Sequence, residues 1–170
     1  MSYNILGINP GHNGSACLVS DGELKYYLEE ERLSRMKYDG NPFKSMIDIM
    51  SKYHVDELVI VGTYPDHPIL PWTMEDVYTG LVRKYYPNVK TTLLGQEHHL
   101  THASCAFYNS GFKKAVAVIV DGAGTYKDIN MNEEGSVKAK GCETESVWTC
   151  EYPSKFTVLH KVFGDNDSLA

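Results

Sequence analysis

The chain has 170 residues, of which 16 are Lys or Arg and 22 are Asp or Glu, so its formal net charge at pH 7 is −6. Nucleic-acid-binding proteins carry a basic surface, and this charge balance disfavours DNA or RNA as the main partner. Apolar runs stay well short of the roughly 20 residues that a membrane-spanning helix needs, and the N-terminus does not have the basic flank and apolar core of a signal peptide. We therefore expect a cytoplasmic protein that binds neither nucleic acid nor a membrane.

Three strand-like runs open the chain, over residues 3–9, 15–20 and 23–28. The first run ends in the turn-rich segment NPGHNG, and Asp21-Gly22 between the second and third runs is a strong hairpin signal. The next segments alternate between helical and strand patterns: helix 43–53, strand 58–61, helix 74–86, strand 89–94, helix 98–108 and strand 115–120. Further strand-like segments cover residues 137–142, 146–152 and 156–163.

This order of elements predicts the fold class. A hairpin meander followed by alternating helices and strands is typical of an α/β fold with a mixed sheet and flanking helices. Strands then resume at residue 115, and both groups of strands begin with an apolar strand that runs into a Gly-rich turn, NPGHNGS and DGAGT. Duplicated nucleotide-binding folds use two such turns to hold phosphates through backbone N–H groups. We expect residues 1–114 to form a first lobe and residues 115–170 to form the first strands of an incomplete second lobe.

A histidine cluster, HHLTH, begins the predicted helix over residues 98–108. His98 and His102 are four residues apart and would project from one helix face, where they can chelate one metal ion. His99 and His102 form a second candidate pair, and the sequence leaves the choice between the two pairs open. The zinc-protease motif is absent because His99 stands where its glutamate belongs, which disfavours that mechanism of hydrolysis. A polar helix terminus without a metal is the alternative interpretation.

Asp121 follows the apolar strand over residues 115–120 and precedes Gly122 and Gly124. Two imidazoles and a carboxylate suit a divalent ion such as Fe²⁺, Mn²⁺ or Zn²⁺, and the remaining coordination positions can take phosphate oxygens. We therefore predict Asp121 as a metal ligand beside His102 and either His98 or His99, with Gly122 and Gly124 contacting a bound phosphate. An ordinary Asp-Gly turn is the alternative.

Two further candidates lie near the first Gly-rich turn. His12 is within that turn, and an imidazole with a pKa of about 6.5 suits a general base at neutral pH. A histidine in a solvent-facing loop is the alternative. Arg32, Arg35 and Lys37 follow in a charged segment, and cations beside a phosphate-binding turn can hold an anionic ligand.

Four blocks of the sequence together resemble the NodU/CmcH-type carbamoyltransferase family, which includes nodulation, antibiotic and cephamycin carbamoyltransferases. The blocks are GINPGHNGSACLVSDGEL, EEERLSRMK, HHLTHASCAFYNSGF and VIVDGAG, in the order of the family and with similar spacing. The resemblance implies a Kae1-like domain with an actin/Hsp70-like (ribonuclease H-like) fold, followed by a smaller YrdC-like domain. It also implies that ATP and carbamoyl phosphate give carbamoyladenylate, whose carbamoyl group passes to a hydroxyl group of a small-molecule acceptor.

The same resemblance assigns roles to individual residues. His98 and His102 match the HxxxH metal pair of the family and Asp121 matches its carboxylate ligand, with Fe²⁺ as the expected ion, bound to nucleotide phosphate oxygens. His12 matches the histidine of the N-terminal motif and is the candidate general base for the acceptor hydroxyl. Lys37 matches a basic position that contacts the carbamoyl or phosphate group.

The chain also departs from the family. Asn13 stands where members commonly have an acidic residue, and 170 residues make about a third of a typical member. We therefore expect an N-terminal segment that is not a competent enzyme alone and that needs the C-terminal lobe and the YrdC-like domain, which a separate chain could supply. The alternatives are a non-catalytic nucleotide- or metal-binding regulatory module of the same fold and a sugar-kinase-like enzyme, which would not need the HxxxH helix.

Overall fold

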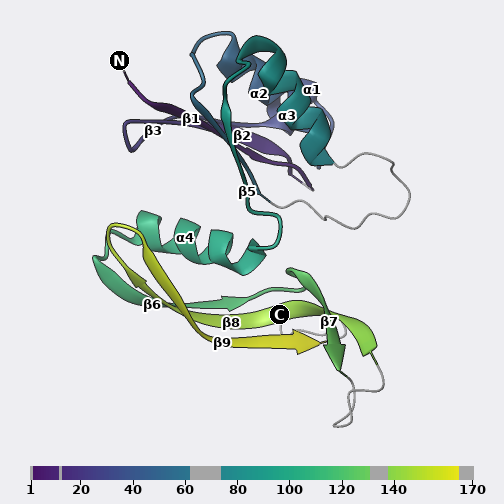
Figure 1. Ribbon diagram of the computed structural model, residues 1–170, viewed down its shortest axis with the longest axis vertical. Helices are drawn as coiled ribbons and strands as arrows, with labels where there is room; N and C mark the ends of the chain where they lie inside the picture. The colour runs from purple at the N-terminus through teal and green to yellow at the C-terminus, as the bar shows by residue number, and fades with distance from the viewer. Residues whose placement is uncertain (1, 12, 62–73, 131–137, 165–170) are drawn as a thin grey trace. The chain divides into compact units, whose positions relative to one another are not determined.

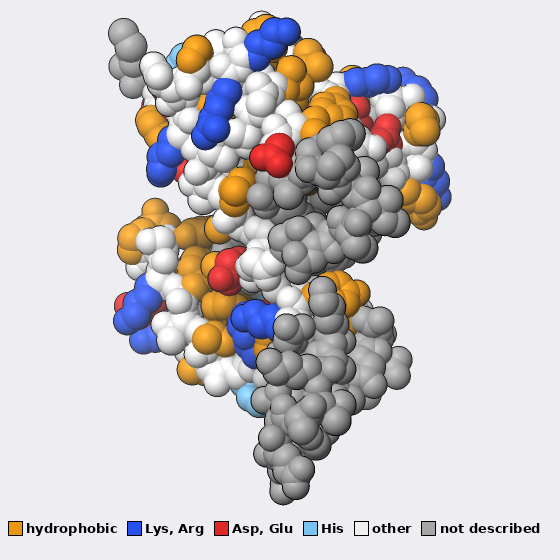
Figure 2. Space-filling model, turned by 45° about the vertical axis from the view of Figure 1, so that its right-hand side comes forward, with side chains coloured by type: hydrophobic (Ala, Val, Ile, Leu, Met, Phe, Trp, Pro, Cys, Tyr) orange, Lys and Arg blue, Asp and Glu red, His pale blue; other side chains and the backbone are white. Residues whose placement is uncertain are grey.

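The computed structural model describes residues 2–11, 13–61, 74–130 and 138–164. The chain forms two compact units, Met1–Gly95 and Gln96–Ala170, and Figure 1 shows the helices and strands of each. The described part of the chain contains no helix long and apolar enough to cross a membrane. On the face drawn in Figure 2, lysine and arginine side chains of the described residues are dispersed among hydrophobic and neutral ones.

The first unit contains a five-stranded mixed sheet with the order β3-β2-β1-β4-β5. Its strands are β1 (Asn4–Asn9), β2 (Ser15–Ser20), β3 (Glu23–Glu29), β4 (Glu57–Ile60) and β5 (Lys90–Leu93). The first three strands pair antiparallel, whereas β4 and β5 run parallel to β1. The predicted hairpin between β2 and β3 is confirmed, because Asp21 and Gly22 have φ values of 50° and 83°, as a tight two-residue turn requires.

The described part of this unit contains the helices α1 (Glu30–Ser34), α2 (Phe43–Met50) and α3 (Met74–Tyr85). The apolar faces of α2 and α3 pack on one face of the sheet and share its core. This core contains Leu6, Ile8, Leu18, Met46, Ile49, Leu58, Ile60, Tyr78 and Val82, all 0 to 2% exposed. The structure confirms the predicted α/β fold with a mixed sheet and flanking helices, which is consistent with an actin/Hsp70-like lobe.

In its described residues, the second unit consists of one helix packed on an antiparallel sheet. The helix is α4 (His98–Ser110), and the strands are β6 (Lys114–Val120), β7 (Tyr126–Asn130), β8 (Lys138–Glu151) and β9 (Lys155–Gly164). The long strand β8 pairs with β6, β7 and β9, and Figure 1 shows α4 lying over this sheet. Ala103 and Phe107 of α4 pack against Ile119, Trp148 and Cys150 in a small apolar core.

The second unit differs from its sequence prediction in two ways. The two short strands expected over 137–142 and 146–152 are parts of the single strand β8, and β7 was not predicted from the sequence. In addition, α4 contacts β6 and β8, so the compact units divide after Gly95. The predicted lobe boundary at residue 114 had placed this helix with the first lobe instead.

Candidate metal centre

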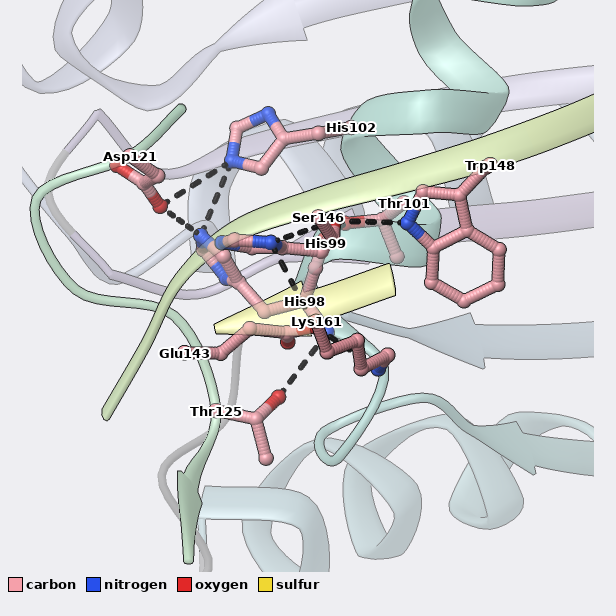
Figure 3. Close-up of polar contacts among 10 residues, drawn as sticks. All are labelled: His98, His99, Thr101, His102, Asp121, Thr125, Glu143, Ser146, Trp148 and Lys161. Carbon is pink, nitrogen blue, oxygen red and sulfur yellow. Dashed lines mark hydrogen bonds and ion pairs between the residues drawn. The ribbon is translucent and has the colours of Figure 1, made fainter. Parts of the chain in front are cut away.

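Three predicted ligands converge in the second unit, as Figure 3 shows. His98 and His102 lie one turn apart at the start of α4, and Asp121 directly follows β6. Nε2 of His98 lies 2.8 Å from Oδ2 of Asp121 and 3.0 Å from Nε2 of His102, and the third distance, from His102 Nε2 to Asp121 Oδ2, is 3.7 Å. The ligand atoms of these residues all lie within 4.8 Å of one another.

The spacing of these atoms matches the ligand spacing around one divalent ion. Bonds of about 2.0–2.2 Å from a metal to nitrogen and oxygen, at angles between octahedral and tetrahedral, place neighbouring ligand atoms roughly 2.8–3.6 Å apart. Two of the three observed distances fall within this range and the third lies close to it. One face of the group stays accessible, because the side chains of His98 and Asp121 are partly exposed and that of His102 is 49% exposed.

Hydrogen bonds among the two imidazoles and the carboxylate cannot satisfy all three facing atoms at once. Nε2 of His98 carries at most one hydrogen, which can be donated to Asp121, and the same nitrogen then has no lone pair left for His102. Nε2 of His102 would retain only Asp121, at 3.7 Å. A shared cation would instead satisfy all three atoms through their lone pairs, so the donor chemistry fits a metal ion.

The electrostatics of the group favour the protonation states that metal binding requires at Asp121 and His102. Burial acts to raise the pKa of Asp121, but the hydrogen bond and charge of His98 and the N–H of Gly122 outweigh it, so the pKa lies below its usual value. Burial lowers the pKa of His102, and the nearby His98 lowers it further. Asp121 is therefore a carboxylate and His102 a neutral imidazole at pH 7, as ligands to a metal must be.

The structure distinguishes between the two histidine pairs that the sequence left open. His99 is fully buried, and its Nδ1 lies 2.8 Å from the Ser146 hydroxyl oxygen rather than beside Asp121. Since residues four apart on a helix share one face, His98 and His102 both reach Asp121 while His99 points toward the sheet. The arrangement thus groups His98 with His102.

Backbone N–H groups of the second Gly-rich turn form hydrogen bonds within the turn and to β8. The N–H of Gly122 donates to Oδ1 of Asp121 at 2.8 Å, and the N–H of Gly124 donates to the Glu143 carbonyl at 2.7 Å. A phosphate that accepted hydrogen bonds from these two N–H groups would have to displace the Asp121 carboxylate and the Glu143 carbonyl as their acceptors. Phosphate contact by Gly122 and Gly124 stays a prediction.

The other predicted residues belong to the first unit. Lys37 lies between α1 and α2, with its Nζ 4.8 Å from the centre of the Tyr38 ring. The segment that follows it packs tightly on the first Gly-rich turn, because the N–H of Gly11 donates to the carbonyl of Gly40 at 2.9 Å. His12 lies outside the described residues. The roles of Lys37 and His12 stay predictions.

A group of buried polar residues that was not predicted from the sequence lies beneath the three candidate ligands. Glu143, Ser146 and Trp148 lie on β8 and Lys161 lies on β9, where they surround His99. Glu143 is fully buried, and its Oε1 lies 2.8 Å from Lys161 Nζ. The only signal of this buried group in the sequence was the additional histidine in HHLTH. Polar residues in a strand do not indicate whether their face of the sheet is buried.

Comparisons with known proteins give distant relatives. The sequence matches no family model. It is 31% identical over 124 residues to Uncharacterized protein MJ1051 of Methanocaldococcus jannaschii, a match that covers 71% of this chain and 22% of that protein. It is 28% identical over 138 residues to Nodulation protein NolNO of Sinorhizobium fredii, covering 68% of this chain and 20% of that protein.

A third relative is Uncharacterized protein sll1178 of Synechocystis, which is 26% identical over 196 residues, covering 94% of this chain and 31% of that protein. The chain thus spans between a fifth and a third of the length of these curated relatives. A prototype foamy virus protease-reverse transcriptase structure matches 98% of this chain and 25% of that one, at 12% identity and a TM-score of 0.32, too low to support an argument. The similarity to the nodulation protein gives distant support to the resemblance to carbamoyltransferases.

Proposed function

We propose that this chain is the N-terminal segment of an ATP- and carbamoyl-phosphate-dependent O-carbamoyltransferase, and that His98, His102 and Asp121 hold its divalent metal. The convergence of these three side chains, within 4.8 Å of one another, carries the proposal. The residues come from two separate sequence blocks that the resemblance connects to this family. A nodulation protein among the relatives agrees with it, since the family includes nodulation carbamoyltransferases.

The proposed metal is Fe²⁺. Two histidines and one carboxylate with open positions form the ligand set of many non-haem Fe²⁺ sites, although Mn²⁺ and Zn²⁺ use similar sets. When bound, the ion would supply positive charge that draws phosphate oxygens of a nucleotide to the site. The exposed side of His102 leaves room for such a ligand to approach.

The protein residues would orient the ligands and move a proton. Asp121 accepts the Gly122 N–H through Oδ1, which leaves Oδ2 directed at the two imidazoles. His12 would remove the proton of the acceptor hydroxyl while that oxygen forms a bond to the carbamoyl carbon of carbamoyladenylate; the bond from this carbon to the phosphate oxygen would break, and AMP would leave. Lys37 would contact the carbamoyl or phosphate group of the donor.

Metal analysis of the purified chain tests the site. Anaerobic titration with Fe²⁺, with and without ATP, is compared among the unsubstituted protein, His98→Ala and His102→Ala. His160→Ala is the matched control, because it removes an exposed histidine of β9 that is not part of the group. We expect one ion per chain in the unsubstituted protein and in the control, and a large loss in the other two. Equal metal content in all four proteins would refute the site.

A further inference from the structure

We infer that His99 is a positioning residue, which holds the turn over residues 121–124 against α4 and so sets the place of Asp121 relative to His98. The inference rests on the proposed function, because it concerns the geometry of the same candidate metal centre. It assigns a role to the third histidine of HHLTH, which does not join the other two.

The His99 ring is held on one side by a buried chain of hydrogen bonds. Its Nδ1 lies 2.8 Å from Oγ of Ser146, and the indole N–H of Trp148 donates to the same oxygen at 2.8 Å, as Figure 3 shows. His99 is 0% exposed, Ser146 is 1% exposed and Trp148 is 5% exposed. Hydrogen bonds in such a buried network restrict the orientation of the ring.

The other side of the ring packs on the turn. A Cβ atom added at Gly124 would lie 2.8 Å from both Cδ2 and Nε2 of His99, so the ring and the Gly124 backbone are in close contact. The N–H of Gly124 donates to the Glu143 carbonyl at 2.7 Å, and the N–H of Glu143 donates to the Thr125 carbonyl at 2.9 Å. The turn is therefore enclosed between the imidazole and β8.

The residues on either side of the contact carry the candidate ligands. His98 precedes His99 on α4, and its backbone N–H lies 3.3 Å from Oγ1 of Thr125. At the other end of the turn, the N–H of Asp121 donates to the Thr144 carbonyl at 2.9 Å. Because the His99 ring lies between these two anchors, a change in its position would alter the 2.8 Å approach of His98 to Asp121.

Helix packing alone does not explain a histidine at this position. Among the described residues, Nε2 of His99 is buried without a hydrogen-bond partner, and burial lowers the pKa of the ring. A leucine would fill a similar volume without an unsatisfied polar atom. The polar ring is thus less favourable for packing than an apolar side chain, and its polar contacts are ones that a leucine could not make: Nδ1 lies 2.8 Å from Oγ of Ser146 and 3.5 Å from Oε1 of Glu143.

The first measurement needs no metal. Amide hydrogen exchange is followed in the unsubstituted chain, His99→Leu, His99→Asn and Ser146→Ala, with His160→Leu as the matched histidine-to-leucine control. We expect at least tenfold faster exchange of the Asp121 and Gly124 amides in His99→Leu and Ser146→Ala. His99→Asn, which keeps a polar atom near the position of Nδ1, should restore most of the protection. The exchange rate of the Phe107 amide, farther along α4, should not change.

The second measurement uses Co²⁺ as a spectroscopic probe of the metal centre. We expect His99→Leu to weaken Co²⁺ binding 10- to 100-fold and to change the visible spectrum, as loss of a residue that orients metal ligands does. His99→Asn should recover both properties. A similar spectrum and affinity in His99→Leu would overturn the inference.

The two measurements separate the inference from the proposed function. If the unsubstituted chain binds neither Co²⁺ nor Fe²⁺, the proposed function fails, while the exchange experiment still decides whether His99 holds the turn. Unchanged exchange at Asp121 and Gly124 in His99→Leu would overturn the inference. So would a uniform increase over the whole second unit, because it would indicate a purely structural role. If His99→Leu does not fold, Ser146→Ala decides the question in the same way.

Discussion

His98 and Asp121 are 23 positions apart in the sequence, yet Nε2 of the histidine lies 2.8 Å from Oδ2 of the aspartate. The pair joins the first turn of α4 to the end of β6, and His102 completes the group from the next helical turn. No contact within either element could produce this approach. It depends on the packing of α4 on the sheet formed by β6, β8 and β9.

The carboxylate charge of Asp121 should dominate metal affinity. Asp121→Asn keeps the shape of the side chain but removes its negative charge, and an amide oxygen is a much weaker ligand for a transition metal. We expect Mn²⁺ or Co²⁺ affinity, measured by isothermal titration calorimetry, to fall about 100-fold or more, since metal sites depend strongly on ligand charge. Glu151→Gln, at an exposed carboxylate of β8, should bind like the unsubstituted protein. Similar affinity in both variants would contradict the assignment of Asp121.

Folding stability should depend on pH through His99. Burial lowers the pKa of His99 in the folded state, so the unfolded chain, with a histidine pKa of about 6.5, takes up the proton at higher pH. The contribution of the neutral His99 ring to the free energy of unfolding is fully present above about pH 6.5. It is lost as the pH falls through the lowered pKa of His99 in the folded state. His102 acts in the same direction, because its pKa is also lowered.

Urea denaturation of the metal-free chain at pH 7.5 and pH 5.5 measures this dependence. The midpoint should fall at the lower pH in the unsubstituted protein and fall less in His99→Leu, which cannot titrate at this position. His160→Leu serves as the control and should retain the full dependence. A larger fall of the urea midpoint in His99→Leu than in the unsubstituted protein would show that His99 does not destabilise the folded chain at low pH.

Gly124 should not tolerate even a methyl group. The added Cβ of Gly124→Ala would lie 2.8 Å from the His99 ring and 2.9 Å from the Glu143 carbonyl oxygen, and the second contact is with backbone that cannot rotate away. Such overpacking typically costs about 1–3 kcal/mol of unfolding free energy. Gly80→Ala is the matched control, because a Cβ there meets no atom within 4 Å and lies in α3, where alanine favours the helix. In chemical denaturation, the free energy of unfolding should fall in Gly124→Ala and rise in Gly80→Ala.

Lys161 should stabilise the protein by neutralising Glu143. Glu143 is fully buried, and Lys161→Met would leave its carboxylate without the cation that lies 2.8 Å away. We expect a loss of about 1–3 kcal/mol, because an uncompensated buried polar group is costly. Lys155→Met, at an exposed position at the start of β9, should have little effect.

A double variant tests the cause of that loss. Adding Glu143→Leu to Lys161→Met removes the buried charge together with its partner, and this should recover much of the stability in denaturant unfolding. Glu143→Leu alone is measured beside them. If the loss of unfolding free energy in the double variant equals the sum of the losses in the two single variants, the ion pair is not the reason for the effect.

Elements whose signals are local could be predicted from the sequence. The β2 range of Ser15–Ser20, the hairpin at Asp21-Gly22 and the start of α4 at His98 all agree with the structure. Helical and strand periodicity are set by hydrogen bonds and side-chain spacing within a few residues, so a single segment contains the information. The same local rule placed His98 and His102 on one helix face.

Which side chains meet depends on how the helix and the strands pack together. The pairing of β6 with β8 and the packing of α4 bring Asp121 to His98, turn His99 inward and bury Glu143, and none of these follows from local periodicity. Burial of a polar strand residue depends on which face of the sheet another element covers, and that is settled by contacts between segments far apart in the chain. The candidate ligands were therefore visible in the sequence, whereas the residues that hold them in place were not.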